Sequence, residues 1–355
     1  MVGPDATSLA VVDSAGIESA MARALLLARK GPPSDPNPRV GCVVLDSCGR
    51  VVGEGWHEGA GTAHAEVAAL AAAGTAAHGG TAVVTLEPCG HTGRTGPCTA
   101  ALITAGVARV VFARADATPD AGGGAQRLRQ AGIQVDQIAS PELRSHATEL
   151  VARWQLAHDL GRPVVTWKLA ATLDGRGAAA DGSSHWITGP LARHDVHDLR
   201  ADADTILVGT GTAWTDDPRL TVRDRRGNDR PRQPRRAVMG LRGLRPGSNL
   251  DCPTTIVLAT RDPHEALATL WALGSRHVWL EGGATLAAAF WQHGLVDNVV
   301  AYIAPALLGL GAPSVADLGI GSIADIARLR LDDVTRLGDD IRLTLTPTVE
   351  PRGRD

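Results

Sequence analysis

The hydrophobic pattern of the first half of the chain predicts alternating helices and strands. Apolar residues recur at helical spacing over residues 17–30, and Gly31-Pro32-Pro33 ends that helix. Short apolar runs at 40–45 and 51–55 predict a hairpin. This order is typical of an α/β domain. The remaining elements are a helix over 64–73 stopped by Gly74, a strand over 81–86, a helix opening at Pro97, a strand near 107–112, a helix near 126–131, a strand near 133–135 and a long helix over 141–160.

The second half begins with residues 164–170, an almost wholly apolar run typical of a strand buried in a parallel or mixed sheet. At 355 residues the chain is long enough for two hydrophobic cores, so we expect a second α/β domain. We place the domains at residues 14–150 and 162–349. Further strands are predicted at 205–209, 255–258, 277–280, 298–303 and 341–345, and helices at 188–200, 263–273 and 284–293.

Composition narrows the class of protein. The chain is 44% hydrophobic and 21% charged, with a formal net charge of −3 and no polybasic run. We therefore expect small-molecule partners and no nucleic acid. No run of about 18 apolar residues and no signal-peptide pattern is present, which predicts a cytoplasmic protein with no membrane partner. Symmetric association is the usual prior, so we expect a homo-oligomer.

The most informative chemical pattern is His64-Ala65-Glu66, followed by Pro88-Cys89 and then Cys98. One imidazole and two thiolates suit a catalytic Zn²⁺, because three protein ligands leave a fourth position for a water whose pKa the metal lowers to about 7. Glu66 would then move protons between that water, the ring nitrogen and the departing ammonia. The pattern predicts a hydrolytic zinc deaminase.

The predicted elements place all four residues at element ends. His64 and Glu66 open a helix, where the helix dipole favours the carboxylate, and Cys89 follows a strand. Cys98 follows Pro97 at a helix N-terminus, which lowers the pKa of a thiol and favours metal binding.

The spacing of the cysteines departs from the usual Cys-x-x-Cys of nucleobase deaminases, because Cys98 lies nine positions after Cys89. The insert carries His91 and Arg94. Since it is held between two metal ligands, we expect both side chains to face substrate. The alternatives are an ordinary surface loop, a closed structural zinc site with His91 as fourth ligand, or unrelated residues with a structural pair of cysteines.

Two features of the second half indicate another site. The only lysines of the chain are Lys30 and Lys168, and Lys168 stands inside an apolar strand, where its compact ammonium differs from the arginines used elsewhere. Glycine turns at 209–212 and 281–284 follow predicted strands and offer backbone N–H groups to a phosphate or pyrophosphate. Neither turn fits G-x-G-x-x-G, so plain loop glycines are the alternative.

Three blocks of the first half carry a family resemblance: Ser34-Asp35-Pro36-Asn37-Pro38-Arg39-Val40-Gly41, the His64 motif, and Glu87-Pro88-Cys89-Gly90-His91-Thr92-Gly93-Arg94-Thr95-Gly96-Pro97-Cys98. They closely resemble the bifunctional riboflavin-biosynthesis deaminase–reductases of bacteria. That family usually has Ser at Gly90 and Pro at Gly96, and neither change touches a ligand. The resemblance implies a cytidine-deaminase-like α/β/α domain. It also implies that Asn37, His91 and Arg94 help to hold a phosphoribosyl-pyrimidine substrate.

The resemblance continues through the second half in Lys168-Leu169-Ala170-Ala171-Thr172-Leu173-Asp174-Gly175-Arg176, Ser184-His185-Trp186-Ile187-Thr188, Asp195-Val196-His197-Asp198-Leu199-Arg200, Asp216-Asp217-Pro218-Arg219-Leu220-Thr221-Val222-Arg223, Glu281-Gly282-Gly283 and Tyr302-Ile303-Ala304-Pro305. It implies a dihydrofolate-reductase-like α/β domain that uses NADPH. By position, the implied NADPH contacts are Ala170, Trp186, Thr212, Asp216, Gly283, Ala284, Thr285, Leu286, Ala287, Ala288 and Ala289. The implied contacts with the phosphorylated sugar and pyrimidine are Ser184, Arg200, Leu220, Arg223 and Glu281.

Simpler roles stay open for some of these residues. Trp186 could be a core residue, and Arg200 and Arg223 could form surface ion pairs. One block also departs from the family, which commonly has Leu-Asp-Ser where this chain has Met239-Gly240-Leu241. The departure removes a serine hydroxyl that helps to hold the cofactor.

The resemblance implies two consecutive reactions, with Zn²⁺ and NADPH as the cofactors. The first domain would deaminate a phosphoribosylamino-pyrimidine, and the second would reduce the ribosyl group of the resulting aminouracil to ribityl. Lys168, Asp216 and Glu281 are the candidate polar groups around the carbon that is reduced, with Lys168 and Asp216 as catalytic candidates. Two alternatives are a deaminase whose second domain has lost cofactor binding, and a nucleotide-sensing or scaffold protein with retired sites.

Overall fold

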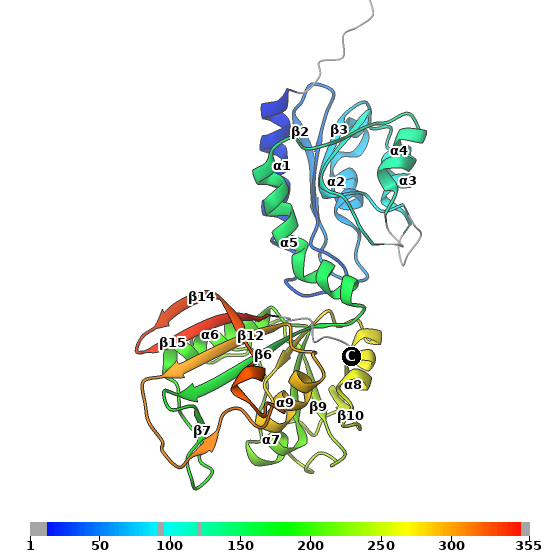
Figure 1. The fold of residues 1–355 in the computed structure, drawn as a ribbon. Coiled ribbons are helices and arrows are strands. Elements are labelled where there is room, and N and C mark those ends of the chain that lie inside the picture. The colour runs from blue at the N-terminus through cyan, green and yellow to red at the C-terminus, as the bar shows by residue number, and fades with distance from the viewer. Residues whose placement is uncertain (1–12, 91–95, 119–121, 349–355) are drawn as a thin grey trace, which may run out of the picture. The chain divides into compact units, whose positions relative to one another are not determined.

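The computed structural model describes residues 13–90, 96–118 and 122–348. The chain divides into two compact units, Met1–Asp159 and Leu160–Asp355, and each is an α/β structure (Figure 1). Among the described residues, no helix is both long enough and apolar enough to cross a lipid bilayer.

The first unit is built on a five-stranded sheet in the order β2-β1-β3-β4-β5. Strand β1 runs antiparallel to both β2 and β3, whereas β3, β4 and β5 are parallel. The strands are β1 (Gly41–Leu45), β2 (Val51–Trp56), β3 (Thr81–Leu86), β4 (Arg109–Arg114) and β5 (Gln134–Gln137). The helices are α1 (Ser14–Ala28), α2 (Ala65–Ala73), α3 (Cys98–Thr104), α4 (Gly124–Gln130) and α5 (Pro141–Leu160), with a 3₁₀ turn at Gly74–Ala77.

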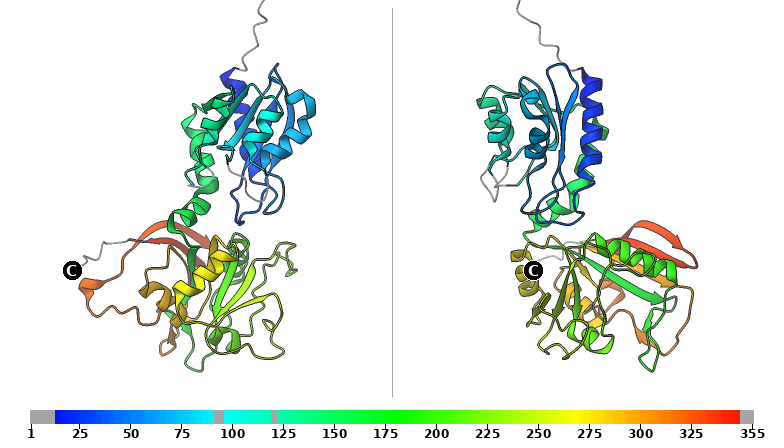
Figure 2. Two further views of the ribbon diagram at one scale, coloured as in Figure 1. Left: turned by 90° about the vertical axis from the view of Figure 1, so that its right-hand side faces the viewer. Right: turned by 180° about the vertical axis from the view of Figure 1, so that it is seen from behind.

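Helices cover both faces of this sheet, as Figures 1 and 2 show. Alternate residues of a strand point to opposite faces, so the fully buried β1 contributes to two cores. Cys42 and Val44 pack with α2, α3 and α4, whereas Val43 and Leu45 pack with α1 and α5. The layers are therefore α/β/α, as the family resemblance implies.

Two glycines bring β2 close to α2, the helix that carries His64 and Glu66. A Cβ on Gly53 would lie 2.2 Å from the carbonyl oxygen of Ala69, and one on Gly55 would lie 2.4 Å from the Ala69 nitrogen. No side chain fits there, so the glycines let backbone approach backbone and fix the position of α2.

The second unit contains an eight-stranded sheet in the order β10-β9-β8-β11-β6-β12-β15-β14. The first six strands in this order are parallel, and the last two are antiparallel additions. The strands are β6 (Val164–Thr172), β8 (Thr205–Gly209), β9 (Arg235–Met239), β10 (Thr255–Leu258), β11 (His277–Leu280), β12 (Asn298–Ala304), β14 (Leu329–Leu337) and β15 (Asp340–Pro347). A small separate sheet pairs β7 (Arg176–Ala178) with β13 (Ala312–Pro313).

Helices also cover both faces of the large sheet. Residues of α8 (Pro263–Ala272) and α9 (Ala284–Gln292) pack in one core with Trp167 and Leu280. Residues of α6 (Pro190–Ala201) and α7 (Thr210–Thr215) pack in the other core with Ile206 and Trp279. A 3₁₀ turn at Ile323–Asp325 completes the elements of this unit.

Strands β3, β8, β10 and β11 and helix α5 have the predicted bounds. The sequence pattern misses β7, α7 and β13, and also β9 and β14. The first three are short, and β14 has only two partly buried residues, so no alternating buried face marks it. Helix α1 begins at Ser14 instead of residue 17, because the Asp13 side chain caps it by accepting the backbone N–H of Gly16.

Candidate functional site

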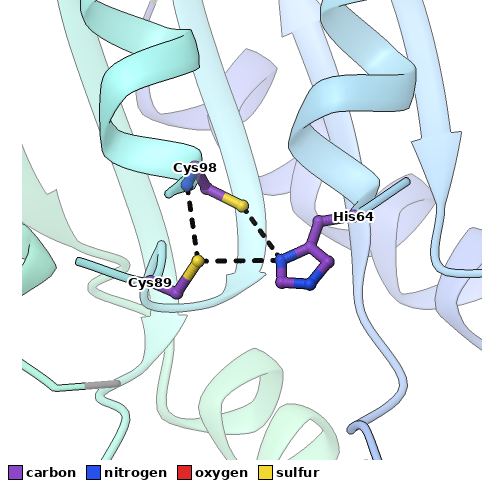
Figure 3. Close-up of side chains that lie close together, drawn as sticks. All are labelled: His64, Cys89 and Cys98. Carbon is purple, nitrogen blue, oxygen red and sulfur yellow. Dashed lines mark hydrogen bonds between the residues drawn. The ribbon is translucent and has the colours of Figure 1, made fainter. Parts of the chain in front are cut away.

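Three side chains of the first unit converge as the sequence predicts (Figure 3). His64 is the N-cap of α2, Cys89 follows β3, and Cys98 is the first residue of α3. Their ligand atoms all lie within 4.8 Å of one another. Nδ1 of His64 is 3.2 Å from Sγ of Cys98 and 3.6 Å from Sγ of Cys89.

These separations fit a zinc ion. With Zn–S near 2.3 Å and Zn–N near 2.0–2.1 Å, neighbouring ligand atoms of a tetrahedral site lie roughly 3.5–3.8 Å apart. The Nδ1–Sγ distances of 3.2 and 3.6 Å are close to that edge length. Among the described residues, these three form the one group of His, Cys, Asp or Glu side chains able to share a metal ion. Three ligands leave a coordination position for solvent or substrate.

The electrostatics of the two thiols favour a negatively charged pair. The Cys98 thiol and the His64 ring stabilise the Cys89 thiolate and lower the pKa of Cys89 to about 4. The same interaction with Cys89, together with burial, raises the pKa of Cys98. The backbone N–H of Cys98 also donates to Sγ of Cys89. A divalent cation binds deprotonated thiols. Cys89 is already a thiolate in the absence of the metal, because the neighbouring groups lower its pKa.

Glu66 lies in the first turn of α2 and is only 4% exposed. Burial raises the pKa of Glu66 above its ordinary value, and the negative Cys89 adds to this effect. A carboxyl group with a raised pKa beside a water-binding metal position is better suited to take up a proton and release it again than an ordinary glutamate is.

Asn37 is held by a residue that the sequence analysis missed, His57. Nδ1 of His57 lies 3.1 Å from the carbonyl oxygen of Ala63, and Nε2 lies 3.1 Å from the amide nitrogen of Asn37. A carbonyl only accepts, so Nδ1 carries the ring proton and Nε2 accepts from Asn37. Oδ1 of Asn37 is then the amide atom left to receive a hydrogen bond from a ligand.

His57 also contacts the metal ligand set. Its ring centroid is 5.5 Å from that of His64, and the two rings meet edge to face at 80°. His57 is 3% exposed, and it follows the half-buried strand β2 directly. A polar residue at the end of such a strand, seven positions before His64, is the signal that could have identified it. The predicted substrate contacts His91 and Arg94 lie outside the described residues.

The second unit contains a cavity of about 880 Å³. Most of the residues expected there by resemblance line it, from β6, the segment after β7, α6, α7 and the turn after β11. The lining includes Lys168, Ala170, Ser184, Trp186, Arg200, Thr212, Asp216, Arg223, Glu281, Gly283 and Ala284. Trp186 is 70% exposed, so it is not a core residue.

The other expected contacts do not line this cavity. Leu220 is buried in the core beside α6 and has a positive φ of 50°. Ala287 and Ala288 are buried on the inner side of α9. Thr285, Leu286 and Ala289 lie on the same helix, beyond its first residue. Of the segment from Gly283 to Ala289, only Gly283 and Ala284 reach the cavity.

Two of the residues that line the cavity, Arg200 and Glu281, form an ion pair. Nε of Arg200 donates to Oε1 of Glu281 at 2.7 Å, and the second guanidinium nitrogen contacts the other carboxylate oxygen. Burial opposes ionisation of Glu281, but Arg200 and Lys168 outweigh it, and the pKa of Glu281 falls to about 2. Arg200 is therefore not a surface ion pair, because its side chain is 13% exposed and that of Glu281 8%.

Two other ionisable groups of the cavity have shifted pKa values. Desolvation lowers the pKa of Lys168, although the nearby Glu281 carboxylate opposes this. Desolvation raises the pKa of Asp216, the C-cap of α7. Both shifts favour the neutral form, in which an amine can accept a proton and a carboxylic acid can donate one.

The cavity also offers features that suit a dinucleotide. Helices α7 and α9 begin directly after glycines 209 and 283, at the C-terminal ends of parallel strands β8 and β11. The N–H of Gly283 donates to the hydroxyl of Thr212 and ties the two turns together. Helix N-termini at this edge of a parallel sheet bind phosphate groups in many proteins.

The departure at Met239-Gly240-Leu241 has a structural counterpart. Gly240 has a φ of 141°, and a Cβ there would lie 2.6 Å from Oγ1 of Thr210. The space that a side chain would need at position 240 is therefore occupied by the Thr210 hydroxyl. Leu241 is 63% exposed.

Both units match known families. Residues 163–343 match the family described as RibD C-terminal domain, and residues 15–114 match the cytidine and deoxycytidylate deaminase zinc-binding region. The riboflavin biosynthesis protein RibD of Corynebacterium ammoniagenes is 50% identical over 282 residues, covering 78% of this chain and 82% of that protein. The Escherichia coli K12 protein of the same name is 43% identical, covering 82% and 88%.

Solved structures agree over nearly the whole length. Acinetobacter baumannii RibD, form 1, superposes with a TM-score of 0.83 at 39% identity, covering 95% of this chain and all of that one. A diaminohydroxyphosphoribosylaminopyrimidine deaminase/5-amino-6-(5-phosphoribosylamino)uracil reductase from Thermotoga maritima gives a TM-score of 0.77 at 29% identity, covering 94% and 99%.

Proposed function

The chain belongs to the RibD family of bifunctional deaminase–reductases, and we propose on this basis which residues carry each reaction. The enzyme acts in riboflavin biosynthesis. It deaminates 2,5-diamino-6-(5-phosphoribosylamino)pyrimidin-4(3H)-one and then reduces the ribosyl group of the resulting aminouracil to ribityl. The observation that carries the assignment is the convergence of His64, Cys89 and Cys98 beside the buried Glu66.

In the deaminase, His64, Cys89 and Cys98 hold zinc. Bound zinc supplies a Lewis acid that makes a water molecule acidic near neutral pH. Glu66 accepts a proton from the attacking water at its carboxylate and delivers it to the amino group that leaves as ammonia. The raised pKa of Glu66 keeps both directions of that transfer accessible.

Substrate orientation in the deaminase rests on Asn37, His91 and Arg94. His57 fixes the amide of Asn37, so that Oδ1 accepts a hydrogen bond from the pyrimidine or its sugar. We assign His91 and Arg94 to the same substrate from the family motif. A cationic Arg94 suits the 5′-phosphate.

In the reductase, NADPH supplies the hydride when it is bound. We assign Ala170, Trp186, Thr212, Asp216 and the segment from Gly283 to Ala289 to the cofactor side. Ser184, Arg200, Leu220, Arg223 and Glu281 belong to the substrate side. Leu220 and the residues of α9 after Ala284 do not line the cavity. Their role is indirect, because they support the backbone that forms its wall.

Lys168 and Asp216 are the proposed proton carriers of the reductase. When the sugar ring is open, C1′ is joined to the nitrogen by a C=N double bond. Reduction of this imine adds a hydride to C1′ and a proton to the nitrogen. Both groups line the cavity, and both have a pKa shifted toward the neutral form. Glu281 holds Arg200 and keeps a negative charge near Lys168.

We also propose that the enzyme is a homo-oligomer that associates through β14. This strand ends the large sheet, and among the described residues it pairs only with β15. Leu331 and Val334 are 55% and 54% exposed, opposite Leu345 and Leu343, which continue the core face of the sheet. An exposed apolar edge of this kind is suited to packing against a second copy of the chain, which would remove it from water.

The remaining parts of the proposal follow the sequence. The catalytic domains are residues 14–150 and 162–349, the partners are small phosphorylated pyrimidines, and the enzyme works in the cytoplasm. Ammonia release from the diaminopyrimidine ribotide tests the deaminase. NADPH oxidation with the deaminated product tests the reductase, and deamination without any oxidation would favour a second domain that has lost cofactor binding.

A further inference from the structure

Helix α6 presents a wall of basic side chains to the reductase cavity. His194, His197 and Arg200 recur at a spacing of three residues, which places them along one side of the helix, and all three line the cavity. Arg223 joins them from the segment after α7.

This wall carries an unbalanced positive charge at Arg223. The charge of Arg200 is matched by Glu281, and Asp224 accepts backbone N–H groups of Arg226 and Asn228. Among the described residues, Arg223 has no acidic partner, and its Nε is buried without a hydrogen-bond acceptor. A buried guanidinium N–H without an acceptor is costly, so this part of the cavity is suited to receive an anion.

The hydrogen bonding of His197 defines which ring atom faces a ligand. The backbone N–H of Arg223 donates to Nδ1 of His197 at 3.3 Å. Nδ1 must therefore be unprotonated, and the ring proton is on Nε2. Among the described residues Nε2 has no hydrogen-bond partner, and the half-buried ring lines the cavity.

The surroundings of His197 keep it neutral. Burial and the charges of Arg200, Arg223 and His194 together lower the pKa of His197 to about 4, although Glu281 opposes them. At neutral pH the side chain is thus an uncharged N–H donor between two guanidinium groups. The neutral ring can donate a hydrogen bond to an anion, and it adds no positive charge that the two guanidinium groups would repel.

We propose that His197 binds the 5′-phosphate of the reductase substrate by donating from Nε2, next to the guanidinium of Arg223. This inference rests on the proposed function, in which the cavity takes a phosphorylated ribosylamino-uracil. A phosphate group of NADPH has the same chemistry, so the test must separate the two sources. His197 is a binding residue and takes no part in the hydride or proton transfer.

Two substitutions separate the proposed contact of Nε2 with the phosphate from the hydrogen bond between Nδ1 and the Arg223 backbone. His197→Asn keeps an acceptor where Nδ1 was, so the bond from the Arg223 backbone is preserved, but it lacks the Nε2 donor. His197→Gln places an amide N–H near the position of Nε2. The reductase is assayed by NADPH oxidation with the phosphorylated aminouracil substrate and with the same compound lacking the 5′-phosphate.

We expect His197→Asn to raise the KM for the phosphorylated substrate about tenfold, as for the loss of one hydrogen bond to a charged group. His197→Gln should stay closer to the wild type. The KM for NADPH and the kcat/KM for the dephosphorylated substrate should be unchanged. His264→Ala, on the exposed face of α8 outside the cavity, is the matched control, and circular dichroism of each variant reports intact folding.

Three results would overturn the inference: a wild-type KM in His197→Asn, an equal loss with both substrates, or a raised KM for NADPH. The last would assign His197 to the cofactor. Failure of the proposed function is a different outcome, since the wild type itself would then oxidise no NADPH with the phosphorylated substrate.

Discussion

The side-chain amide of Asn37 lies 3.1 Å from Nε2 of His57, whose ring packs edge-on against the metal ligand His64. This contact links the zinc site to a residue expected to bind substrate. Asp35 supports the arrangement, because its carboxylate accepts the backbone N–H groups of Asn37 and Ala60. The orientation of the amide is therefore set before substrate arrives, which reduces the entropy lost on binding.

His57→Phe should raise the KM of the deaminase about tenfold, because Asn37 loses the acceptor that orients its amide. His57→Gln keeps an acceptor at that position and should stay near the wild type. Deaminase kinetics with zinc analysis of each variant check this. An unchanged KM in a zinc-loaded His57→Phe variant would show that the contact does not orient Asn37.

Glu66→Gln should slow ammonia release by a factor of roughly 10²–10⁴, the usual contribution of a positioned general acid or base. The amide has nearly the same shape as the carboxyl group but cannot carry the proton. Zinc content and NADPH oxidation with the deaminated substrate should both stay at wild-type levels. Unchanged ammonia release would refute the assigned role of Glu66.

Removing the metal should separate the two activities. A chelator should abolish ammonia release from the diaminopyrimidine ribotide. It should leave NADPH oxidation with the deaminated substrate intact, because the three zinc ligands all belong to the first unit. Adding Zn²⁺ should restore the deaminase. A parallel loss of both activities on chelation would contradict the assignment of zinc to the first unit alone.

The pair of Arg200 and Glu281 should make the second unit sensitive to acid. The pKa of Glu281 falls from 4.5 to about 2 in the folded chain, so folding favours the ionised form. Its stabilising effect is fully present above about pH 4.5 and is lost as the pH falls through about 2. Circular dichroism across this range should show a smaller pH dependence in Glu281→Gln than in the wild type.

Arg200→Met tests the same pair from the other side. It leaves the Glu281 carboxylate buried without its main partner, which should cost about 3–5 kcal/mol in the free energy of unfolding of the second unit. Chemical unfolding followed by a probe in that unit measures the change. A loss below about 1 kcal/mol would mean that the pair behaves as an exposed ion pair.

Val334→Arg should dissociate the proposed homo-oligomer. The charge would stand on the exposed apolar edge formed by Leu331 and Val334, beside the partly buried Leu343 and Leu345, where a second copy is expected to pack. Light scattering after gel filtration gives the mass of each form. Ile103→Arg, on the exposed face of α3, is the control, and an equal mass for Val334→Arg and wild type would place the interface elsewhere.

Much of the fold and the metal site could be predicted from sequence. The ligands lie at element ends that strong local signals define, namely Gly74 after α2, Pro97 before α3 and the apolar run of β3. Once these helices and strands are predicted correctly, the spacing of the motif is enough to bring His64, Cys89 and Cys98 together.

Other parts of the site depend on contacts between distant segments, which periodicity does not encode. The role of His57 follows from the contacts of its ring with Asn37 and His64, and that of His197 from the Arg223 backbone N–H that fixes its tautomer. Strand β14 was not predicted because Asp332 and Asp333 interrupt the alternation of its apolar residues and no face of the strand is buried.

The most direct test of the account is mass analysis of products from the diaminopyrimidine ribotide and the zinc-loaded enzyme, with and without NADPH. Without NADPH, the product should have exchanged its amino group for oxygen and kept its ribosyl group. With NADPH, that product should gain two further hydrogens and become the ribityl compound. An unchanged ribotide in both reactions, or reduction of the sugar without prior loss of ammonia, would contradict the account.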